Sequence, residues 1–431
     1  MTQSSRDRLE LTLFRIADHE GEGARACLTV YAEAARATAD AADARAKAGI
    51  SLGPLDGAIV SIKDLFDVAG EPTRAGSRVL ADEAKPATAD APAIRHLRQA
   101  GCVIVAKTNM TEYAFSGVGM NPHYGTPGNP ADRARVPGGS TSGGAVAAAD
   151  GMCEIAIGTD TGGSTRIPAA LCGIVGFKPS MQRVPTGGAF PLSFSLDSIG
   201  PMARTVAGCA LADAVMAGDE LDTVVPAPLA GLRIAALQGL VLTSADETVG
   251  RRYPAALKRL GKAGVQLSDQ KLALIDAMVE VNALGGLAPP EAFMIHRDRI
   301  KRRGDEIDPN VRARIARGGD MSAADYVYSQ RRRAELIRAM DAALADYDAF
   351  VWPTTPIVAP TIAEMEDTKV FSANNMLLLR NTNIVNFFDL CAISLPLPGD
   401  GLPCGLMLVG RNGADRRLFQ IAAAVERLFA G

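Results

Sequence analysis

The sequence predicts an α/β fold organised as a single large domain, with a two-domain arrangement as the less favoured alternative. Near the N-terminus, residues 57–63 and 102–109 are apolar strand-like segments that enclose a helical segment at 91–101. This strand–helix–strand order is typical of a sheet with right-handed crossovers. Further strand-like segments occur near the C-terminus, and no low-complexity linker or internal repeat separates the two regions. Strands from both ends of the chain are therefore expected in one sheet.

Each of these first elements has a local physical reason. The segment at 57–63 is apolar until it ends at Lys63. Asp90 precedes the helix and Gly101 ends it, because glycine readily adopts the left-handed conformation found after helix C-termini. The run CVIVAKTN at 102–109 is rich in β-branched residues, which is typical of a strand buried on both faces.

The rest of the chain alternates between helical and strand-like segments. Residues 24–48 are rich in alanine and predict one or two helices, and helices are expected to dominate from about 244 to 346. Short helical and strand pieces are expected between the glycines of the central region, at 144–151, 153–160, 166–173 and 174–180. Strands are predicted at 232–237, 349–355, 391–397 and 403–410, followed by an amphipathic helix at 414–429.

The composition excludes several classes of protein. The 431 residues are 48% hydrophobic and 22% charged, which is the profile of a globular protein and not of a disordered chain. The formal net charge of −3 gives no general attraction to nucleic acid or to an anionic membrane. The N-terminal segment is polar and no long uncharged apolar run occurs, so neither a signal peptide nor a membrane span is expected. The seven cysteines form no CxxC pair and are expected to be buried thiols, as in a reducing cytoplasm.

Glycine is concentrated between residues 117 and 200, which hold 17 of the 43 glycines in the chain. Two glycine–serine turns, 136–149 and 157–173, lie in this region, and their serines Ser140 and Ser164 are 24 positions apart. Glycine and serine are common in tight turns, so two ordinary turns are one interpretation. The other is functional, because amides at a helix start and successive amides of small residues favour a negative charge such as an oxyanion. In that arrangement Ser164 can attack a carbonyl group held by the same amides.

Motifs for several other chemistries are absent. The sequence has no GxSxG elbow, no GxxxxGK[ST] loop, no GxGxxG after a strand and no HExxH, so no metal or nucleotide cofactor is expected. Only four histidines are present. His19, His96 and His296 lie in charged helical contexts and are expected to be solvated. His123 is on a loop where it can line a pocket, although a structural role is favoured.

A serine nucleophile without a histidine needs another base, and a lysine can serve if burial lowers its pKa. Lys63 follows the apolar segment that begins at residue 57, and Lys107 follows the apolar run that begins at residue 102. The two lysines have the same kind of local context. The residues by themselves therefore do not choose between them.

Three segments resemble the amidase signature family of serine hydrolases. They are DGAIVSIKDLFDVAG (56–70), PGGSTSGGAVAAADG (137–151) and GTDTGGSTRIPAALCGIVGFKPS (158–180). The likeness is dense from about 52 to 210 and recurs at 350–360 and 392–410. The resemblance implies one domain over residues 1–431, in which a central mixed β-sheet is covered by helices on both faces. It also implies that the helical portion at about 244–346 lies on the substrate side.

The same resemblance implies a catalytic site. The family's Lys–Ser–Ser triad falls on Lys63, Ser140 and Ser164, which decides between the two lysines. Ser140 matches a serine that follows a cis peptide bond in relatives, here the bond from Gly139. Ser142 is the alternative residue for this bridging role. No metal or other cofactor is implied.

Further site residues follow from the family pattern. The oxyanion hole falls on four successive backbone amides, those of Thr161, Gly162, Gly163 and Ser164. Asp160 and Arg166 flank the nucleophile and are expected to form an ion pair that braces its loop. The acyl pocket is expected to draw on apolar side chains of 110–125 and 185–198, for which core packing is the alternative role: Tyr113, Phe115, Met120, Phe190 and Phe194.

The implied activity is hydrolysis of a C–N bond in a small, uncharged linear amide through an acyl-enzyme on Ser164; ester and carbamate hydrolysis share this chemistry. The main alternative is the A subunit of a tRNA-dependent amidotransferase. Such proteins tend to carry an acidic residue before a T-x-x-x-N segment, where this chain has Leu379, Arg380 and Asn381. The basic run at 296–304 is expected to be a solvated helix face, so neither nucleic acid nor a membrane is an expected partner. A homodimer is one expectation, because relatives of the family are often homodimers.

Overall fold

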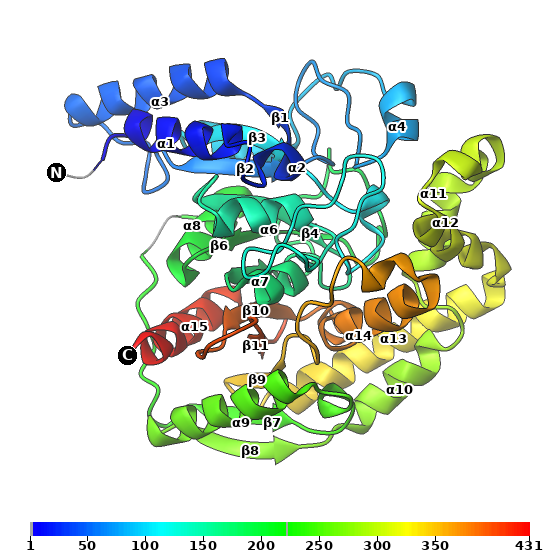
Figure 1. The fold of residues 1–431 in the computed structure, drawn as a ribbon. Helices are drawn as coiled ribbons and strands as arrows, with labels where there is room; N and C mark the ends of the chain where they lie inside the picture. Colours follow the sequence, from blue (N-terminus) through cyan, green and yellow to red (C-terminus); the bar gives the residue numbers. More distant parts are fainter. Residues whose placement is uncertain (1–2, 221–222) are drawn as a thin grey trace.

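One eleven-stranded β-sheet runs through the described part of the chain, residues 3–220 and 223–431 of the computed structural model (Figure 1). Its strand order is β1-β3-β2-β4-β6-β5-β10-β11-β9-β7-β8. The strands are β1 (Cys27–Val30), β2 (Ile59–Lys63), β3 (Val103–Thr108), β4 (Ile155–Asp160), β5 (Val175–Lys178), β6 (Ser198–Ala203), β7 (Arg233–Leu237), β8 (Gln266–Gln270), β9 (Ala349–Pro353), β10 (Cys391–Pro396) and β11 (Gly405–Gly410).

The sheet is mixed. Strand β2 runs parallel to β3 and β4, and β7 runs parallel to β8 and β9. The other neighbouring pairs are antiparallel. Strands β10 and β11, from near the C-terminus, lie in the middle of the sheet between β5 and β9. The prediction that both ends of the chain share one sheet is therefore confirmed.

Fifteen α-helices and five short 3₁₀ helices occur in the described residues. The α-helices are α1 (Ser5–Ala17), α2 (Gly23–Ala26), α3 (Ala32–Lys47), α4 (Arg78–Glu83), α5 (Pro92–Gln99), α6 (Ser142–Ala149), α7 (Arg166–Cys172), α8 (Val206–Ala217), α9 (Glu247–Lys262), α10 (Ala273–Asn282), α11 (Ala288–Arg303), α12 (Pro309–Ala316), α13 (Ala323–Leu344), α14 (Thr368–Phe387) and α15 (Asp415–Ala430). The 3₁₀ helices are η1 (Glu112–Ala114), η2 (Leu240–Leu242), η3 (Gly304–Glu306), η4 (Arg317–Asp320) and η5 (Glu364–Glu366).

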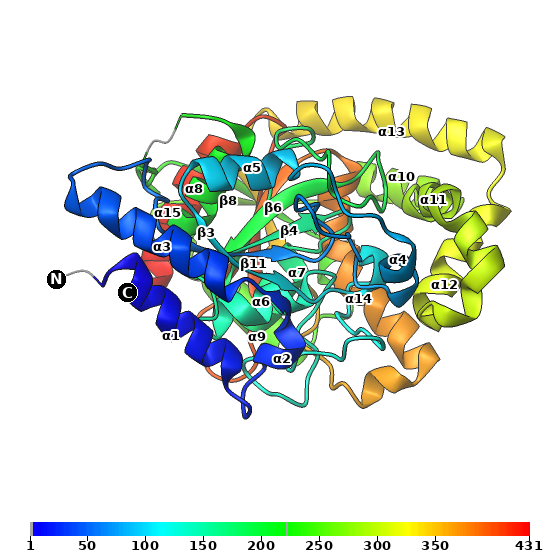
Figure 2. The ribbon, with the colours of Figure 1, turned by 90° about the horizontal axis from the view of Figure 1, so that it is seen from above.

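Helices cover both faces of the sheet. Alternate residues of a strand point to opposite faces, and the residues on each face pack against a different set of helices. In β3, Val103 and Val105 belong to the apolar cluster formed with α1, α3 and α6. Ile104, between them, belongs to the cluster that includes residues of α5, α8 and α15. The two views place both chain termini at one end of the molecule and α11 and α12 at the other (Figure 2). The predicted fold class is thus confirmed.

Two parallel neighbours position the residues of interest. Lys63 ends β2, and the turn at 161–164 follows β4, which lies beside β2. Because the carboxyl ends of parallel strands meet at one edge of a sheet, the lysine and the second glycine–serine turn come together there. The first glycine–serine turn leads into α6, which packs against both strands.

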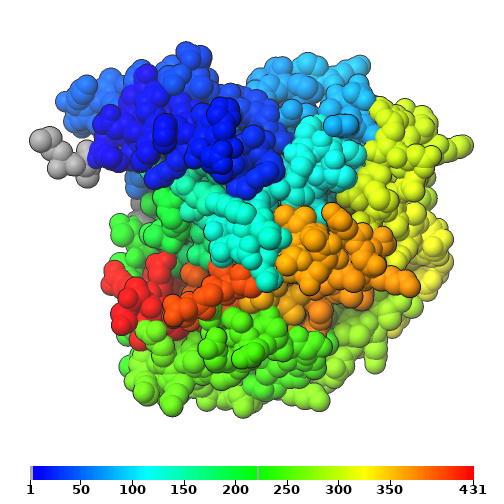
Figure 3. Space-filling view, in the orientation of Figure 1, coloured from blue at the N-terminus to red at the C-terminus, as the bar shows by residue number. Residues whose placement is uncertain are grey.

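Helix α14 reaches this edge from far along the chain. The segment before it is tied to the loop before α6: the amide of Val136 donates to the carbonyl of Pro360 at 3.0 Å, and the amide of Ile362 donates to the carbonyl of Ala134 at 2.8 Å. In Figure 3 the orange surface of α14 and its preceding segment abuts the cyan surface of that loop. Residues near 380 are therefore brought beside the signature core.

Some elements differ from the sequence-based expectation. The alanine-rich segment 24–48 is divided by β1, a four-residue edge strand that pairs with β3 and is too short to interrupt the helical pattern visibly. Strand β8 interrupts the expected helical region; it is a polar edge strand, QLSDQ, without an apolar run. Strand β6 and helices α1, α4, α8 and α14 have no counterpart among the expected elements. The remaining predicted strands are present within a few residues of their expected bounds.

All seven cysteines are buried and free, which confirms the expected thiols. No helix among the described residues is both long and apolar enough to cross a membrane. A cytoplasmic location stays a prediction.

Candidate active site

Lys63 is the last residue of a strand that is buried along its whole length, and its own side chain is fully buried. Its side-chain nitrogen Nζ donates to the hydroxyl oxygen of Ser140 at 2.8 Å and to that of Thr159 at 3.0 Å. Thr159 lies on β4, the neighbouring parallel strand. The lysine is thus held between two hydroxyl groups in the interior of the protein.

The environment of Lys63 favours its neutral form. Burial lowers the pKa of Lys63 to about 7, while the negative charges of Asp197 and Asp160 act in the opposite direction and raise it. A lysine with a pKa near neutrality can accept a proton at physiological pH, which an ordinary surface lysine cannot do.

Ser140 follows a glycine that no larger residue can replace. The Gly139–Ser140 peptide bond is cis. A Cβ atom on Gly139 would lie 2.7 Å from the backbone nitrogen of Gly119, so no larger residue fits there. Ser140 itself is fully buried, and the amide of the next residue, Thr141, donates to the carbonyl of Ser164 at 3.3 Å. This bond joins the two glycine–serine turns.

Ser164 lies in the short turn between β4 and α7. Gly163, just before it, has a φ of +136°, a conformation that residues with a side chain rarely adopt. A Cβ atom there would also lie 2.2 Å from the hydroxyl oxygen of Thr382 in α14. The carbonyl of Gly162 accepts a hydrogen bond from that hydroxyl at 2.6 Å. The backbone of the turn is therefore packed directly against α14.

Asp160 and Arg166 form the ion pair expected from the sequence, and both side chains are fully buried. Arg166 donates to the two carboxylate oxygens of Asp160 at 2.8 and 3.0 Å. Asn386 of α14 donates to Asp160 at 2.9 Å and accepts from Arg166 at 2.7 Å. Burial alone would raise the pKa of Asp160, but the charge of Arg166 and these hydrogen bonds hold that pKa far below its usual range. The pair braces the turn on its inner side.

Asp197 holds the outer side of the same turn. Its carboxylate accepts from the hydroxyl of Thr161 at 2.5 Å and from the amides of Leu192 and Ser193 at 2.9 and 3.0 Å. Burial raises the pKa of Asp197 to about 6. The carboxylate thereby ties Thr161, the first residue of the turn, to the loop that precedes β6.

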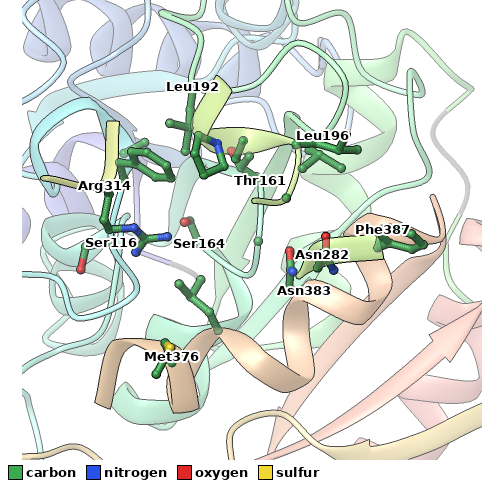
Figure 4. Close-up of a pocket in the computed structure, with 18 of the residues that line it drawn as sticks. Ser116, Thr161, Ser164, Leu192, Leu196, Asn282, Arg314, Met376, Asn383 and Phe387 are labelled. Carbon is green, nitrogen blue, oxygen red and sulfur yellow. The ribbon is translucent and has the colours of Figure 1, made fainter. Parts of the chain in front are cut away.

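A cavity of about 350 Å³ opens at Ser164. Figure 4 shows Ser164 and Thr161 facing it, with Leu192 and Leu196 on one side and residues of α14 on the other. Most of its other lining residues are apolar. Among them are Ala114, Phe115, Leu287, Met376, Leu379 and Phe387, and the polar residues Ser116 and Asn383 also line it. The cavity can hold a small organic molecule with a carbonyl group beside Ser164.

The sequence matches one known protein family over most of its length. The family model described as Amidase matches residues 9–419. The chain belongs to the amidase signature family. It is 36% identical over 405 residues to the 2-amino-5-chloromuconic acid deaminase of Comamonas testosteroni, an alignment that covers 91% of this chain and 86% of that protein.

Two further comparisons extend over nearly the whole chain. The A subunit of the glutamyl-tRNA(Gln) amidotransferase from Symbiobacterium thermophilum is 34% identical, and the alignment covers 97% of this chain and 92% of that protein. A crystal structure described as an amidase superposes with a TM-score of 0.87 at 30% identity, and covers 99% of this chain and 96% of that one. The protein is thus an amidase signature enzyme that acts on C–N bonds.

The five side chains predicted to line the acyl pocket lie in different parts of the structure. Of the five apolar side chains expected there, Phe115 lines the cavity at Ser164. Phe190 and Phe194 line a neighbouring cavity of about 110 Å³, and Phe194 is also exposed. Met120 packs at the edge of a separate apolar cluster, and Tyr113 is buried in the main core.

One histidine prediction is wrong. His296, expected to be solvated, is fully buried in α11, with its ring 4.1 Å from the ring of Tyr113 between centroids. Burial, together with the charge of Arg299, lowers the pKa of His296 to about 3. Most of the basic residues around it in the sequence are exposed, so nothing in the sequence indicated that His296 faces the interior with Glu291 and Ala292.

The other three histidines also lie away from the cavity lining. His19 is exposed and His96 is half-buried, with Nδ1 3.0 Å from the carbonyl oxygen of Met216. His123 lies with Nε2 3.1 Å from the carboxylate of Glu112. Among the residues that the structure describes, no histidine lines the amidase signature cavity.

The two alternative residues from the sequence analysis, a lysine in place of Lys63 and a serine in place of Ser140, lie elsewhere. Lys107 is buried on β3, with Nζ 3.4 Å from the carboxylate of Glu71. Ser142 is buried at the start of α6, and its hydroxyl oxygen has no hydrogen-bond partner in the described part of the chain. Neither residue takes the place beside Lys63 that Ser140 occupies.

Four side chains of this amidase signature site had no signal in the sequence pattern: Thr159, Asp197, Asn386 and Arg314. Thr159 and Asp197 lie within the stretch of family resemblance, but nothing in the pattern singles out either residue. Asn386 and Arg314 come from α14 and α12, far along the chain. Nothing local connects those two with Ser164.

Proposed function

We propose that this protein is a serine amidohydrolase that cleaves the C–N bond of a small linear amide through an acyl-enzyme on Ser164. The observation that carries the proposal is the fully buried contact of 2.8 Å between Lys63 Nζ and the Ser140 hydroxyl. The lowered pKa of Lys63 supports it, since a neutral lysine is the base that a serine relay without histidine requires.

The proposed relay runs from the cavity inward. Ser164 transfers its hydroxyl proton to Ser140 as its oxygen attacks the substrate carbonyl, and Ser140 passes its own proton to neutral Lys63. The C–N bond then breaks, and the proton returns through Ser140 to the leaving amine. Water then attacks the acyl ester and gives its proton through Ser140 to Lys63. The proton returns through Ser140 to the departing oxygen of Ser164, which restores the free serine.

The negative charge of the tetrahedral intermediate is proposed to rest on the backbone amides of residues 161–164. Two braces support that role. The Asp160–Arg166 pair fixes the turn from inside, and Asp197 fixes Thr161 from outside. Fixed donors need no reorganisation as charge develops, and loss of one such donor costs about 3 to 4 kcal/mol in comparable enzymes.

The lining of the cavity favours a hydrolase over the glutaminase component of an amidotransferase. Among the described lining residues there is no carboxylate that could bind the ammonium group of glutamine. Leu379 faces the cavity, while the side chain of Arg380 donates to Thr243 and the side-chain amide of Asn381 donates to the carbonyls of Val241 and Pro353. Amide, ester and carbamate cleavage all remain within the proposed chemistry.

The test is to follow adduct formation by mass spectrometry during turnover of simple amides and esters by the isolated chain. Ser164→Ala should abolish both the adduct and turnover. Ser142→Ala is the matched control, because it removes a buried serine of the same motif whose hydroxyl has no partner in the described structure. Full activity of Ser164→Ala, or an adduct on another residue, would refute the scheme. Ammonia release from glutamine that needs a second protein would favour the amidotransferase alternative.

A further inference from the structure

Arg314 brings a positive charge into the cavity at Ser164. It lies on α12, and its guanidinium carbon sits 4.4 Å from the ring centroid of Phe115, which also lines the cavity. Figure 4 shows the guanidinium directed toward the side of the cavity where Ser116 and Ser164 lie. The charged end of this side chain is therefore inside the site and not in bulk solvent.

This guanidinium has no counter-charge. Its Nη1 atom is buried and has no hydrogen-bond partner, and Arg314 takes part in no ion pair within the described residues. By contrast, Arg312 on the same helix pairs with Asp305. Burial, together with the nearby charge of Arg317, lowers the pKa of Arg314 to about 10. A guanidinium nitrogen that is buried without a partner is costly, and such atoms are normally paired.

The described lining of the two cavities that Arg314 borders contains further positive charge and no acidic residue. The described lining of the Ser164 cavity contains neither aspartate nor glutamate. A second cavity of about 640 Å³ shares Arg314, Leu379 and Asn383 with it. That cavity also contains Arg317 and Arg380, and again no acidic residue in its described lining. An anion in either cavity therefore meets positive charge and no acidic residue among the described lining residues.

We propose that Arg314 binds a carboxylate of the substrate, so that the natural substrate is an amide that also carries a carboxylate group. The inference rests on the proposed function, since it assumes that the reacting amide lies beside Ser164. The apolar residues Leu192 and Leu287 cover the carbon chain between the two groups. A guanidinium is well suited to this role because its N–H groups match the geometry of a carboxylate. The proposal replaces the uncharged substrate expected from the apolar residues in the sequence.

The kinetic test compares isosteric pairs that differ only in charge: succinamate with succinamide, glutaramate with glutaramide, and adipamate with adipamide. The wild-type protein should prefer one of the anionic partners by about 10- to 100-fold in kcat/KM, the range for a hydrogen bond to a charged group. Arg314→Met should bring that ratio close to one, and Arg314→Lys should keep part of it. Arg312→Met removes one positive charge from the same helix outside the cavity and should keep the wild-type ratio. Circular dichroism and thermal unfolding show that each variant is folded.

Binding gives a test that does not depend on turnover. Glutaramate and the other anionic members should bind the Ser164→Ala protein more tightly than their diamides by calorimetry, and addition of Arg314→Met should remove the difference. The inference is overturned if the diamides are preferred, or if Arg314→Met leaves the ratios unchanged. Turnover of the neutral amides with no anionic preference would overturn this inference and leave the proposed function standing. Absence of both turnover and a Ser164 adduct would refute the proposed function, and the binding ratios would still decide the role of Arg314.

Discussion

The lysine–serine relay predicts that activity falls steeply below neutral pH. Lys63 must be neutral to accept a proton, and burial lowers its pKa to about 7. With such a pKa the neutral fraction is roughly 90% at pH 8, roughly 50% at pH 7 and about 1% at pH 5. The value of kcat/KM should therefore fall about 90-fold between pH 8 and pH 5, with a slope that approaches one log unit per pH unit.

Two carboxylates near Lys63 help to assign this pH dependence. Asp197 has a pKa raised to about 6 by burial, so it titrates in the same range as the lysine. Asp160 does not, because its pKa lies far below its usual range: burial alone would raise it, but pairing with Arg166 outweighs that effect. Since the charge of Asp197 raises the pKa of Lys63, Asp197→Asn should lower that pKa and move the acid limb to lower pH. If Asp197 were itself the essential base, the limb would vanish in this variant.

The assay is kcat/KM for one neutral amide, such as butanamide, from pH 5 to pH 9 at constant ionic strength. Lys63→Ala should lower the value at pH 8 by about 100- to 10,000-fold, the usual contribution of a general base, and should abolish the acid limb. A flat wild-type profile would refute the reasoning. So would a profile that still rises about tenfold per pH unit at pH 9, because a lysine with the ordinary pKa of 10.5 would give that rise and burial would then not favour the neutral form.

Three further predictions test the surroundings of the relay. Lys63→Met should weaken the pH dependence of stability: the folded pKa of Lys63, about 7, lies below the ordinary value of 10.5, so the unfolded chain binds more protons and wild-type stability rises between these two pH values. Urea unfolding at pH 7 and pH 9 measures this, and equal changes in the two proteins would contradict it. Asp160→Asn should cost about 3 to 5 kcal/mol of unfolding free energy, because it leaves Arg166 buried without a counter-charge, whereas Glu335→Gln in an exposed pair should cost less than about 1 kcal/mol. A similar loss in both variants would show that the buried pair is not special. Gly163→Ala should lower kcat/KM about 100-fold or more, because the new Cβ atom would displace the turn that carries Ser164 from Thr382. Gly187→Ala, whose nearest atom would be 3.9 Å away, is the control, and an active Gly163→Ala enzyme would contradict the assigned packing of the turn.

The sequence was most informative where local chemistry decides the outcome. The apolar runs of β2, β3 and β4 can only be satisfied by burial on both faces, so they were recognisable without any partner strand. The glycine excess at 117–200 was informative for a similar reason. Gly139 and Gly163 have no room for a side chain, so their sequence pattern already marked where the backbone turns tightly. The homodimer drawn from family resemblance stays a prediction, which light scattering would check.

Local chemistry was less informative for short or polar elements. Strands β1 and β8 lie at the two edges of the sheet, where a strand needs few apolar residues because one side has no neighbouring strand. His296 was misassigned because a basic helix can still turn one position inward, and only packing against Tyr113 shows which one. In each case the deciding contact is with a residue far away in the sequence.

The two lysines show what the sequence alone determined and what the tertiary structure decided. Both Lys63 and Lys107 were recognisable as lysines at the ends of buried strands. In the sheet, Lys107 is in register with Ile62, one position before Lys63. Because successive side chains of a strand point to opposite faces, Lys107 faces Glu71, and Lys63 faces Ser140 on the other side.

The same holds for Arg314, which is separated from Ser164 by about 150 residues of sequence. Its neighbours in the sequence are those of any basic helix. Only the packing of α12 against the signature core places the charge of Arg314 beside Phe115. The sequence by itself thus determined which groups are proposed to react, because tight turns and buried strands leave a local pattern. Which groups face one another, and which charge faces the substrate cavity, was decided by strand register and helix packing, which are set by contacts between distant parts of the chain.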